Sequence, residues 1–470
     1  MMKDLNVNTV VIGGGPSGYS AAFRLSDLGI NTVLIEKNNF LGGVCLNKGC
    51  IPSKYLLHIS KIIEEAKNLK KFDININIKN INLLNIMLEK KKIIKSLRNG
   101  IKTISKKKNI SILNGEAYFE NKNSILINCF NKNKKFVKRI NFKNAIISSG
   151  SKPITLPNIP YSNVRVWNST DALNFLTIPK NMLIIGSGII GMEMATIYSS
   201  LGSKIDVIER SENFFPYLDK DITKIFKKSI LNKFNLLLGT KIIKISEKKE
   251  GLLVSLSNFK NFNKKKLYDV ILVSVGREPN IKKLKLKNVP IKINKFGYIN
   301  VNEKLQTNLK NIYAIGDVIG FPMLAHKGSY QGKIVAEIIY GRNIYYQPKI
   351  IPYIIYSNPE VAWTGILENE AIKKNINYKI AKFPWKFSGR AISSGYNLGL
   401  TKLIFNSDTN RIIGGIVIGS GASEMLGEIS LAIEMCCDAE DISLTMHAHP
   451  TLYETICLSS EIFQKKCIDI

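Results

Sequence analysis

The sequence predicts an α/β protein with two Rossmann-like dinucleotide-binding units, a central segment and a C-terminal α+β region. Two observations indicate this class. A strand–turn–helix–strand pattern with a G-x-G-x-x-G turn occurs twice, and the two copies are separated by a constant 173 residues. From about residue 348, strand-like and amphipathic helical segments follow without a nucleotide motif. We therefore expect four domains, over residues 1–150, 151–278, 279–347 and 348–470.

The first copy opens with an apolar strand and turns into a helix through three glycines. Gly13 allows the tight turn, Gly15 lets the backbone approach a pyrophosphate, and Gly18 lets helix and strand pack closely. The next strand ends in Glu36, whose carboxylate is expected to bind ribose hydroxyls. With strand, helix, strand and terminal acid all in place, the pattern strongly indicates a dinucleotide site.

The second copy has the same parts and implies a second dinucleotide. Its turn is formed by Gly186, Ser187, Gly188, Ile189, Ile190 and Gly191. The strand after its helix ends in Glu209, and a carboxylate there binds a free 2′-hydroxyl and repels a 2′-phosphate. NAD is therefore favoured over NADP. Arg210 follows directly and weakens this preference, because an arginine here can also meet a phosphate.

Two cysteines lie shortly after the first nucleotide motif, which suggests a disulfide that exchanges electrons with a ring cofactor. Cys45 and Cys50 are five residues apart, a rise of about 7.5 Å in a regular helix. A disulfide needs Cα atoms closer than roughly 7 Å, so an ideal helix cannot span the pair, and Gly49 lets the backbone bend. Pro52 fits the first turn of a new helix, whose dipole favours a thiolate at Cys50.

A histidine near the C-terminus is a candidate acid–base group. His449 precedes a proline, and Glu454 follows at an expected helix start, which suits an imidazole held in one tautomer by a carboxylate. His447, two residues earlier, is expected to be structural. His326 is expected to lie at a helix entry and not to act as a catalyst.

Composition limits the class of protein. The chain of 470 residues is 45% hydrophobic and 22% charged, as in soluble globular proteins, and no apolar run is long enough to cross a bilayer. The first strand begins so early that we expect no signal or transit peptide. Seven cysteines do not form the even set of a secreted disulfide framework, so a reducing cytoplasm is expected. We expect no metal site and no membrane association.

A net charge of +31 raises the alternative of nucleic-acid binding. The excess is nearly all lysine, scattered among Asn and Ile residues that share A/T-rich codons, and no nucleic-acid fold signature accompanies it. We therefore expect no nucleic-acid partner, although a basic surface could help to recruit an acidic one.

These motifs occur in an order that resembles the FAD-dependent class I pyridine nucleotide-disulfide oxidoreductases, most closely the dihydrolipoyl dehydrogenase family. The resemblance covers Val10 to Phe463. It implies non-covalently bound FAD, NAD, and a redox disulfide in which Cys45 meets the substrate and Cys50 faces the flavin. The residues that it places around FAD are Gly13, Gly15, Gly18, Glu36, Lys37, Gly43, Lys54, Ala117, Gly150, Asp317 and Ala325. Those that it places around NAD, besides the second glycine turn, are Glu193, Glu209, Ile242, Gly276 and Arg277.

The resemblance also implies partners and an activity. Lys54 and Glu193 would form an ion pair beside the flavin and nicotinamide, and His449, oriented by Glu454, would be the general base. In this family that histidine reaches the disulfide of the other subunit, so a homodimer with a shared active site is expected. The implied reaction reoxidises dihydrolipoyl groups on the acyltransferase of a 2-oxo acid dehydrogenase complex, or on a glycine-cleavage carrier protein, and reduces NAD⁺.

Two related enzyme classes remain as alternatives. Glutathione-type reductases share both nucleotide units and the cysteine pair but use NADPH, which the acidic Glu209 disfavours. Mercuric-type reductases carry a vicinal cysteine pair near the extreme C-terminus. The adjacent Cys436 and Cys437 lie in an apolar helical pattern upstream of His449, and we interpret them as core residues.

Overall fold

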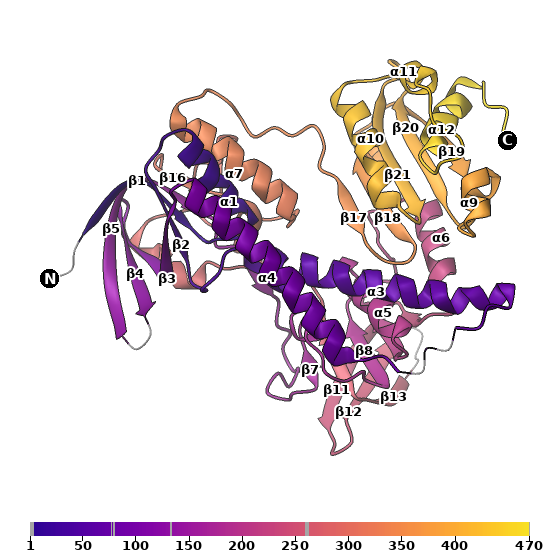
Figure 1. Ribbon diagram of the computed structural model, residues 1–470, viewed down its shortest axis with the longest axis horizontal. Coiled ribbons are helices and arrows are strands. Elements are labelled where there is room, and N and C mark those ends of the chain that lie inside the picture. Colours follow the sequence, from indigo (N-terminus) through magenta and orange to yellow (C-terminus); the bar gives the residue numbers. More distant parts are fainter. Residues whose placement is uncertain (1–3, 77, 79, 132–133, 259–262, 470) are drawn as a thin grey trace. The chain divides into compact units, whose positions relative to one another are not determined.

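A computed structural model describes residues 4–76, 78, 80–131, 134–258 and 263–469. The chain divides into two compact units (Figure 1). Unit 1 comprises Met1–Ser53, Ile81–Ile154 and Gly276–Gln347, and unit 2 comprises Lys54–Asn80, Thr155–Val275 and Pro348–Ile470. Each unit combines two of the segments expected from the sequence, and the four-domain division stays a prediction.

Unit 1 is built on a six-stranded sheet. Its strands β1, β2, β5 and β16 pair in parallel, and β4 pairs antiparallel with β3 and β5. The strands are β1 Leu5–Ile12, β2 Thr32–Glu36, β3 Ser111–Asn121, β4 Ser124–Asn131, β5 Lys134–Ile147 and β16 Ile312–Ala314. A short antiparallel pair, β6 Ser151–Pro153 and β15 Arg277–Pro279, follows the end of β5. The central strands are buried because helices cover a parallel sheet.

The helices of unit 1 include two that pack closely against each other. Helices α1 and α7 lie side by side (Figure 1), and Gly332 of α7 approaches α1 so closely that a Cβ would collide with its backbone. Their small apolar residues, Ala21, Ala22 and Ala336, form part of one buried cluster. The helices are α1 Pro16–Asp27, α2 Gly43–Lys48, α4 Leu83–Lys107 and α7 Ala325–Tyr340.

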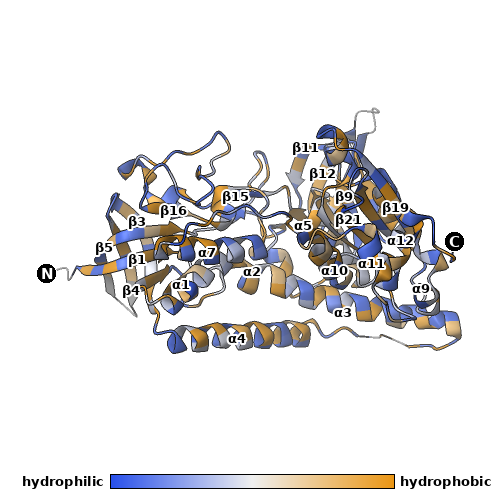
Figure 2. Cartoon of the chain, turned by 90° about the horizontal axis from the view of Figure 1, so that it is seen from above, coloured by the Kyte–Doolittle hydropathy of each residue, from blue (hydrophilic) through white to orange (hydrophobic). Residues whose placement is uncertain are grey.

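Helix α3, Cys50–Asn68, begins in unit 1 and continues into unit 2. Hydrophobic and hydrophilic residues alternate along α4 (Figure 2), and several of its leucines, Leu84, Leu88 and Leu97, are exposed. No helix in the described part of the chain is long and apolar enough to cross a membrane.

Unit 2 contains a second parallel sheet and, separate from it, a three-stranded antiparallel sheet. The parallel sheet has the order β10-β9-β8-β14-β7, with helix α5 following β8. These elements are β7 Val166–Trp167, β8 Asn181–Ile185, α5 Ile189–Ser200, β9 Lys204–Ile208, α6 Lys220–Ile230, β10 Asn235–Leu237 and β14 Val270–Val273. A three-stranded antiparallel sheet is formed by β11 Thr240–Glu247, β12 Leu252–Asn258 and β13 Asn263–Tyr268.

The C-terminal part of unit 2 is a five-stranded antiparallel sheet, drawn in orange and yellow in Figure 1. Helices α10 and α12 pack on it, and apolar residues of both join the core of the sheet. Its strands are β17 Tyr353–Ile355, β18 Glu360–Gly365, β19 Tyr378–Pro384, β20 Leu400–Asn406 and β21 Ile412–Gly419. Its helices are α8 Glu368–Lys373, α9 Gly389–Ser393, α10 Ala422–Glu434, α11 Ala439–Leu444 and α12 Glu454–Gln464. The predicted fold class, two Rossmann-like units and a C-terminal α+β region, is confirmed.

Candidate functional site

The first glycine turn has the geometry of a phosphate cradle. Gly13 has φ +111°, and a Cβ there would collide with the carbonyl oxygen of Ser148. Helix α1 begins just after Gly15 with Pro16, and no described side chain caps its first turn, so N–H groups of that turn can meet an anion. A Cβ on Gly15 would meet only Gly43, at 3.7 Å, so this side of the turn is open.

Acidic side chains flank this turn in unit 1. The buried Glu36 carboxylate accepts hydrogen bonds from the Gly14 N–H at 2.8 Å and from the Asn38 backbone N–H at 2.9 Å. Asp317 accepts from the Ser151 hydroxyl at 2.5 Å, and Ser149 Oγ is buried without a hydrogen-bond partner in the described residues. An open glycine cradle, an uncapped helix start and an unpaired buried hydroxyl fit a dinucleotide such as FAD.

The other residues predicted for this site occupy varied environments. Lys37 is exposed directly after β2, Gly43 is the first residue of α2, and Gly150 follows β5 with φ +72°. Ala325 is the first residue of α7, whose start is also uncapped by any described side chain. Ala117 is buried in the sheet core on β3. Their contacts with the cofactor stay predictions.

The cysteine pair is joined as a disulfide at a break between two helices. Cys45 lies in α2, Cys50 begins α3, and Gly49 separates the helices with φ −141° and ψ −99°. The Cα atoms of the two cysteines are 4.6 Å apart, within the range a disulfide allows. The predicted bend at Gly49 is confirmed, and Pro52 lies in the first turn of α3 as expected. Helix α3 begins at Cys50 itself, one residue earlier than predicted, so the thiol belongs to the positive end of the helix dipole.

An ammonium group in unit 2 is held between a carboxylate and an aromatic ring. Lys54 Nζ lies 2.9 Å and 3.1 Å from the two carboxylate oxygens of Glu193, on α5, as the family resemblance implied. The same Nζ lies 4.3 Å from the centre of the Tyr356 ring, and the Tyr356 N–H donates to Glu193 at 3.4 Å. Burial raises the pKa of Tyr356, which keeps its hydroxyl protonated. Sequence analysis missed Tyr356, because nothing in the spacing links it to Lys54.

The second glycine turn reproduces the geometry of the first. Gly186 has φ +101°, helix α5 begins after Gly188 without a cap from any described side chain, and a Cβ on Gly188 would meet nothing within 4 Å. The Glu209 carboxylate accepts from the Ser187 N–H and hydroxyl, both at 3.1 Å, and from the Ser211 N–H at 3.0 Å. These residues fit a second dinucleotide whose ribose hydroxyls bind an oriented carboxylate.

Three residues predicted for the second site are not beside its glycine turn in sequence, and the structure places two of them in unit 1. Arg277 pairs with β6, the strand after β5, and the carbonyl of Gly276 accepts a hydrogen bond from the Ile154 N–H at 3.1 Å. Arg277 also donates to the Ser151 hydroxyl at 2.7 Å and to its carbonyl at 2.8 Å. Arg277 therefore shares Ser151 with Asp317, a residue of the first site. Ile242 lies half-buried on β11 and packs against the core of the second parallel sheet. Their contribution to NAD binding stays a prediction.

The C-terminal histidine has the partner expected from the sequence. His449 Nδ1 lies 3.1 Å from the carboxylate of Glu454, the first residue of α12. An ionised carboxylate only accepts hydrogen bonds, so Nδ1 carries the proton and Nε2 is free to act as a base. The His449 side chain is 79% exposed and that of Glu454 is 10% exposed. The exposed imidazole ring is therefore held by a buried carboxylate.

Two further expectations concern residues outside this constellation. His326 is the second residue of α7, at the helix entry predicted for it. The interpretation of Cys436 and Cys437 as core residues is wrong for Cys436, which is exposed, because α10 ends at Glu434 and the chain turns at Cys436 with φ +60°. Cys437 is half-buried against the C-terminal core. Within the described residues, no group of three or more His, Cys, Asp or Glu side chains is arranged to hold a metal ion.

Comparison with protein families decides the affiliation. Residues 7–332 match the model of the pyridine nucleotide-disulphide oxidoreductases, and residues 351–459 match the dimerisation domain of the same family. The chain belongs to this family. It is therefore an oxidoreductase with a C-terminal dimerisation domain.

Individual relatives narrow the affiliation. A dihydrolipoyl dehydrogenase of Buchnera aphidicola subsp. Acyrthosiphon pisum is 54% identical over 470 residues, covering 100% of this chain and 98% of the relative. One of Vibrio cholerae is 47% identical with the same coverage. The resemblance to the dihydrolipoyl dehydrogenase family is thereby confirmed, and FAD and NAD are the cofactors of that family.

Solved structures show the same fold at lower identity. LpdA from Mycobacterium tuberculosis superposes with a TM-score of 0.87 at 21% identity, covering 97% of this chain and 100% of the other. A Cu(II) complex of the HOCl-induced flavoprotein disulfide reductase RclA from Escherichia coli gives 0.86 at 24% identity, covering 97% of this chain and 99% of the other.

Proposed function

We propose that this chain oxidises protein-bound dihydrolipoyl groups and delivers the electrons to NAD⁺. The observation that carries the proposal is the Cys45–Cys50 disulfide at the start of α3, directly after an intact nucleotide cradle. The relatives named above are dihydrolipoyl dehydrogenases over the full length of this chain, which supports a dithiol of this class as the substrate. FAD and NAD⁺ supply the hydride chemistry when they are bound.

The disulfide would exchange with the substrate dithiol in two steps. A substrate thiolate attacks the sulfur of Cys45, the Cys45–Cys50 bond breaks, and a mixed disulfide forms while Cys50 leaves as a thiolate. The second substrate thiolate then attacks the substrate sulfur of the mixed disulfide, which releases cyclic lipoyl disulfide and leaves both cysteines reduced. Two electrons thus pass from the substrate to the protein. The N-terminus of α3 favours the thiolate at Cys50.

His449 would accept the proton that the substrate thiol loses. Its Nε2 is the free basic nitrogen because Glu454 holds the proton on Nδ1. Removing the proton raises the fraction of thiolate, which is the species that attacks a disulfide.

The remaining residues would bind and orient the cofactors. Glu36 and Asp317 would hold hydroxyl groups of FAD, and Glu209 the adenosine ribose of NAD. Lys54, fixed between Glu193 and Tyr356, would place one positive charge near the flavin and nicotinamide.

The protein would act as a homodimer with an active site shared between subunits. The dimerisation domain supports two copies, and the exposure of His449 leaves its ring available to a partner chain. The partner enzymes would be the lipoylated acyltransferases of 2-oxo acid dehydrogenase complexes, and a glycine-cleavage carrier is the second candidate. A cytoplasmic location is consistent with the five cysteines outside the redox pair, all of which are free thiols.

The test is an anaerobic titration of the purified FAD-loaded protein with dihydrolipoamide, followed by addition of NAD⁺. With one equivalent of dihydrolipoamide per chain we expect two new thiols per chain and a long-wavelength charge-transfer band between a thiolate and the oxidised flavin. After NAD⁺ is added, NADH should form and the thiols should be lost again. The Cys45→Ser variant should show none of these with dihydrolipoamide. If only NADPH together with another disulfide turns the enzyme over, a glutathione-type activity replaces this proposal.

A further inference from the structure

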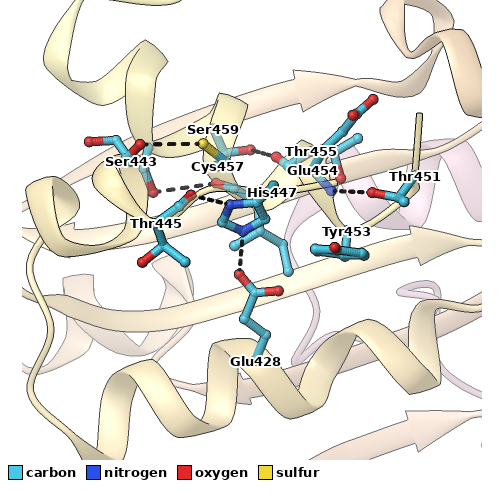
Figure 3. Close-up of polar contacts among 12 residues, drawn as sticks. Glu428, Ser443, Thr445, His447, Thr451, Tyr453, Glu454, Thr455, Cys457 and Ser459 are labelled. Carbon is cyan, nitrogen blue, oxygen red and sulfur yellow. Dashed lines mark hydrogen bonds and ion pairs between the residues drawn. The ribbon is translucent and has the colours of Figure 1, made fainter. Parts of the chain in front are cut away.

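The loop that presents His449 contains a second histidine, whose side chain is buried. The side chain of His447 is 5% exposed, although that of His449, two residues later, is 79% exposed. His447 Nε2 lies 2.7 Å from a carboxylate oxygen of Glu428 on α10, and its Nδ1 lies 2.6 Å from the carbonyl oxygen of Thr445 (Figure 3). Both nitrogens of one buried ring are thus engaged, one by a neighbouring helix and one by the loop itself.

The partners of the ring define its charge. A carbonyl oxygen has no proton to give, so Nδ1 must donate to Thr445. Nε2 faces a carboxylate and donates to it as well, which makes the ring an imidazolium paired with Glu428. Contacts with the Cys457 thiol and the Glu428 carboxylate raise the pKa of His447 to about 10, against the opposing effect of burial.

Ala448, between the two histidines, is also held by hydrogen bonds of its backbone N–H and carbonyl groups. The Ala448 N–H donates to the Tyr453 hydroxyl at 3.1 Å, and the Ala448 carbonyl accepts from the Thr451 hydroxyl at 2.7 Å. The Tyr453 ring packs beside the His447 ring, with centroids 5.4 Å apart. The chain from Thr445 to Tyr453 is therefore held from α10 on one side and from the start of α12 on the other (Figure 3).

We propose that His447 is a positioning residue, which through its ion pair with Glu428 pins this loop to α10 and so fixes where His449 is presented. The inference rests on the proposed role of His449 as the base. The His449 ring is 79% exposed, so surrounding packing does little to orient it. Apart from the contact of its Nδ1 with Glu454, its position depends on the path of the backbone. A displacement of about 1 Å at such a group can cost on the order of 100-fold in rate.

Two substitutions separate the two contacts of the ring. In His447→Gln the side-chain amide can donate from the position of Nε2 to Glu428, and in His447→Asn it can donate from the position of Nδ1 to Thr445. The Glu428 contact joins residues 19 apart, whereas Thr445 is two residues away in the same loop. If the ion pair pins the loop, Gln preserves more function than Asn. Glu428→Leu breaks the same contact and leaves His447 in place.

The control is an ion pair of the same unit with no link to this loop. Glu370 and Lys374, in and directly after α8, lie 2.7 Å apart with side chains 49% and 56% exposed. Glu370→Gln removes a charge in that surface pair and should leave every measurement unchanged, because exposed pairs contribute little.

Two activities of the FAD-loaded enzyme distinguish a role of His447 in positioning His449 from a role in the stability of the folded chain alone. The reduction of NAD⁺ by dihydrolipoamide needs the base, whereas the reduction of ferricyanide by NADH does not involve dithiol exchange. We expect His447→Asn and Glu428→Leu to lower kcat with dihydrolipoamide about 10- to 100-fold and to shift its pH profile. The ferricyanide rate should stay within about twofold, since no dithiol has to be deprotonated for it.

A readout without turnover is available because the chain has only four histidines. NMR of histidine labelled with ¹³C, assigned with the His449→Gln variant, should show a changed His449 signal in His447→Asn and in Glu428→Leu and a conserved signal in Glu370→Gln.

The outcomes separate this inference from the proposed function. Unchanged dihydrolipoamide kinetics in both His447→Asn and Glu428→Leu would overturn the positioning role, as would a parallel loss of both activities together with a lower unfolding midpoint. If His449→Gln retains dihydrolipoamide oxidation, the base assignment fails instead. Should His447→Asn fail to fold, Glu428→Leu decides the question.

Discussion

At the scale of single residues, the carboxylate of Glu209 is held so that it faces the second glycine turn. One of its oxygens accepts from the Ser187 N–H and hydroxyl, and the other from the Ser211 N–H. Because these contacts fix the carboxylate, its charge and remaining lone pairs act at one place. We therefore expect Glu209 to be the residue that selects NAD⁺ over NADP⁺.

Replacing Glu209 by Gln should lower kcat/KM for NAD⁺ about tenfold, the cost of one hydrogen bond to a charged group. The rate with NADP⁺ relative to NAD⁺ should rise, because the charge that repels a 2′-phosphate is gone. Steady-state kinetics with each cofactor measure both effects. Glu212→Gln, an exposed acid three residues later, is the control and should change neither. An unchanged preference in Glu209→Gln would show that another residue selects the cofactor.

The buried imidazolium of His447 also makes a prediction for stability. Its pKa in the folded chain is raised to about 10 from the ordinary value of 6.5. A raised pKa means that the folded chain holds the proton more tightly than the unfolded chain does, so the stabilisation is fully present below pH 6.5 and is lost as the pH rises to 10.

The unfolding midpoint of the wild type should therefore exceed that of His447→Gln most at pH 6. The difference should shrink steadily between pH 6.5 and 10. Thermal unfolding of both proteins across this range measures it, and comparing the two removes the contribution of other groups. A difference that grows with pH would mean that His447 is neutral in the folded chain.

At the scale of elements, the two glycines of one turn have different tasks. Gly186 needs its φ of +101°, and a Cβ there would lie 2.7 Å from the carbonyl oxygen of Ser274. Gly188 has an ordinary backbone with φ −69°, and its Cβ would meet nothing described within 4 Å. Gly186 is therefore needed for the backbone to fold into this turn, whereas Gly188 leaves open space in which the ligand can bind.

Gly186→Ala should lower the unfolding midpoint of the apo chain, whereas Gly188→Ala should leave it within about a degree, because surface changes without strain cost under 0.5 kcal/mol. Gly188→Ala should instead weaken NAD⁺ binding at least tenfold, since the new methyl group occupies the approach of the pyrophosphate. Calorimetric unfolding and fluorescence titration with NADH test the pair. Equal destabilisation by both substitutions would contradict this division.

Secondary-structure elements and contacts between residues close in sequence could be predicted, because both depend on neighbouring residues. The repeat fixed both glycine turns and the acids after them, and the spacing of Cys45 and Cys50 required the break at Gly49 that the structure contains. The end of α10 was missed, so Cys436 was misplaced in the core. The apolar pattern continues past the point where the backbone turns, and hydrophobic periodicity alone does not show that end.

Contacts between distant residues were accessible only where a family resemblance supplied them. The Lys54–Glu193 pair was predicted in this way and is present. Two other contacts were not predicted, because tertiary packing alone brings their partners together. They are the contact of the Tyr356 ring with Lys54 and the ion pair between His447 and Glu428. The spacing of residues in the sequence does not predict such contacts. A single histidine is therefore interpreted as structural unless the structure shows its partners.

At the scale of the whole molecule, we propose that two copies of the chain are needed to complete each active site. The disulfide belongs to unit 1 and His449 to unit 2, where its side chain is 79% exposed. If each active site takes its cysteines from one subunit and its base from the other, two variants that are inactive alone can complement each other. A Cys45→Ser chain supplies an intact His449, and a His449→Gln chain supplies an intact disulfide.

Equal amounts of the two variants, unfolded together and refolded with FAD, should recover about a quarter of the wild-type activity with dihydrolipoamide. Half of the dimers formed at random are mixed, and each mixed dimer has one complete site of two. Each variant refolded alone should stay inactive, and a mixture made without unfolding should gain activity only as fast as subunits exchange. If the site lay within a single chain, no mixture could contain a complete one, and the activity would stay at the level of the separate variants.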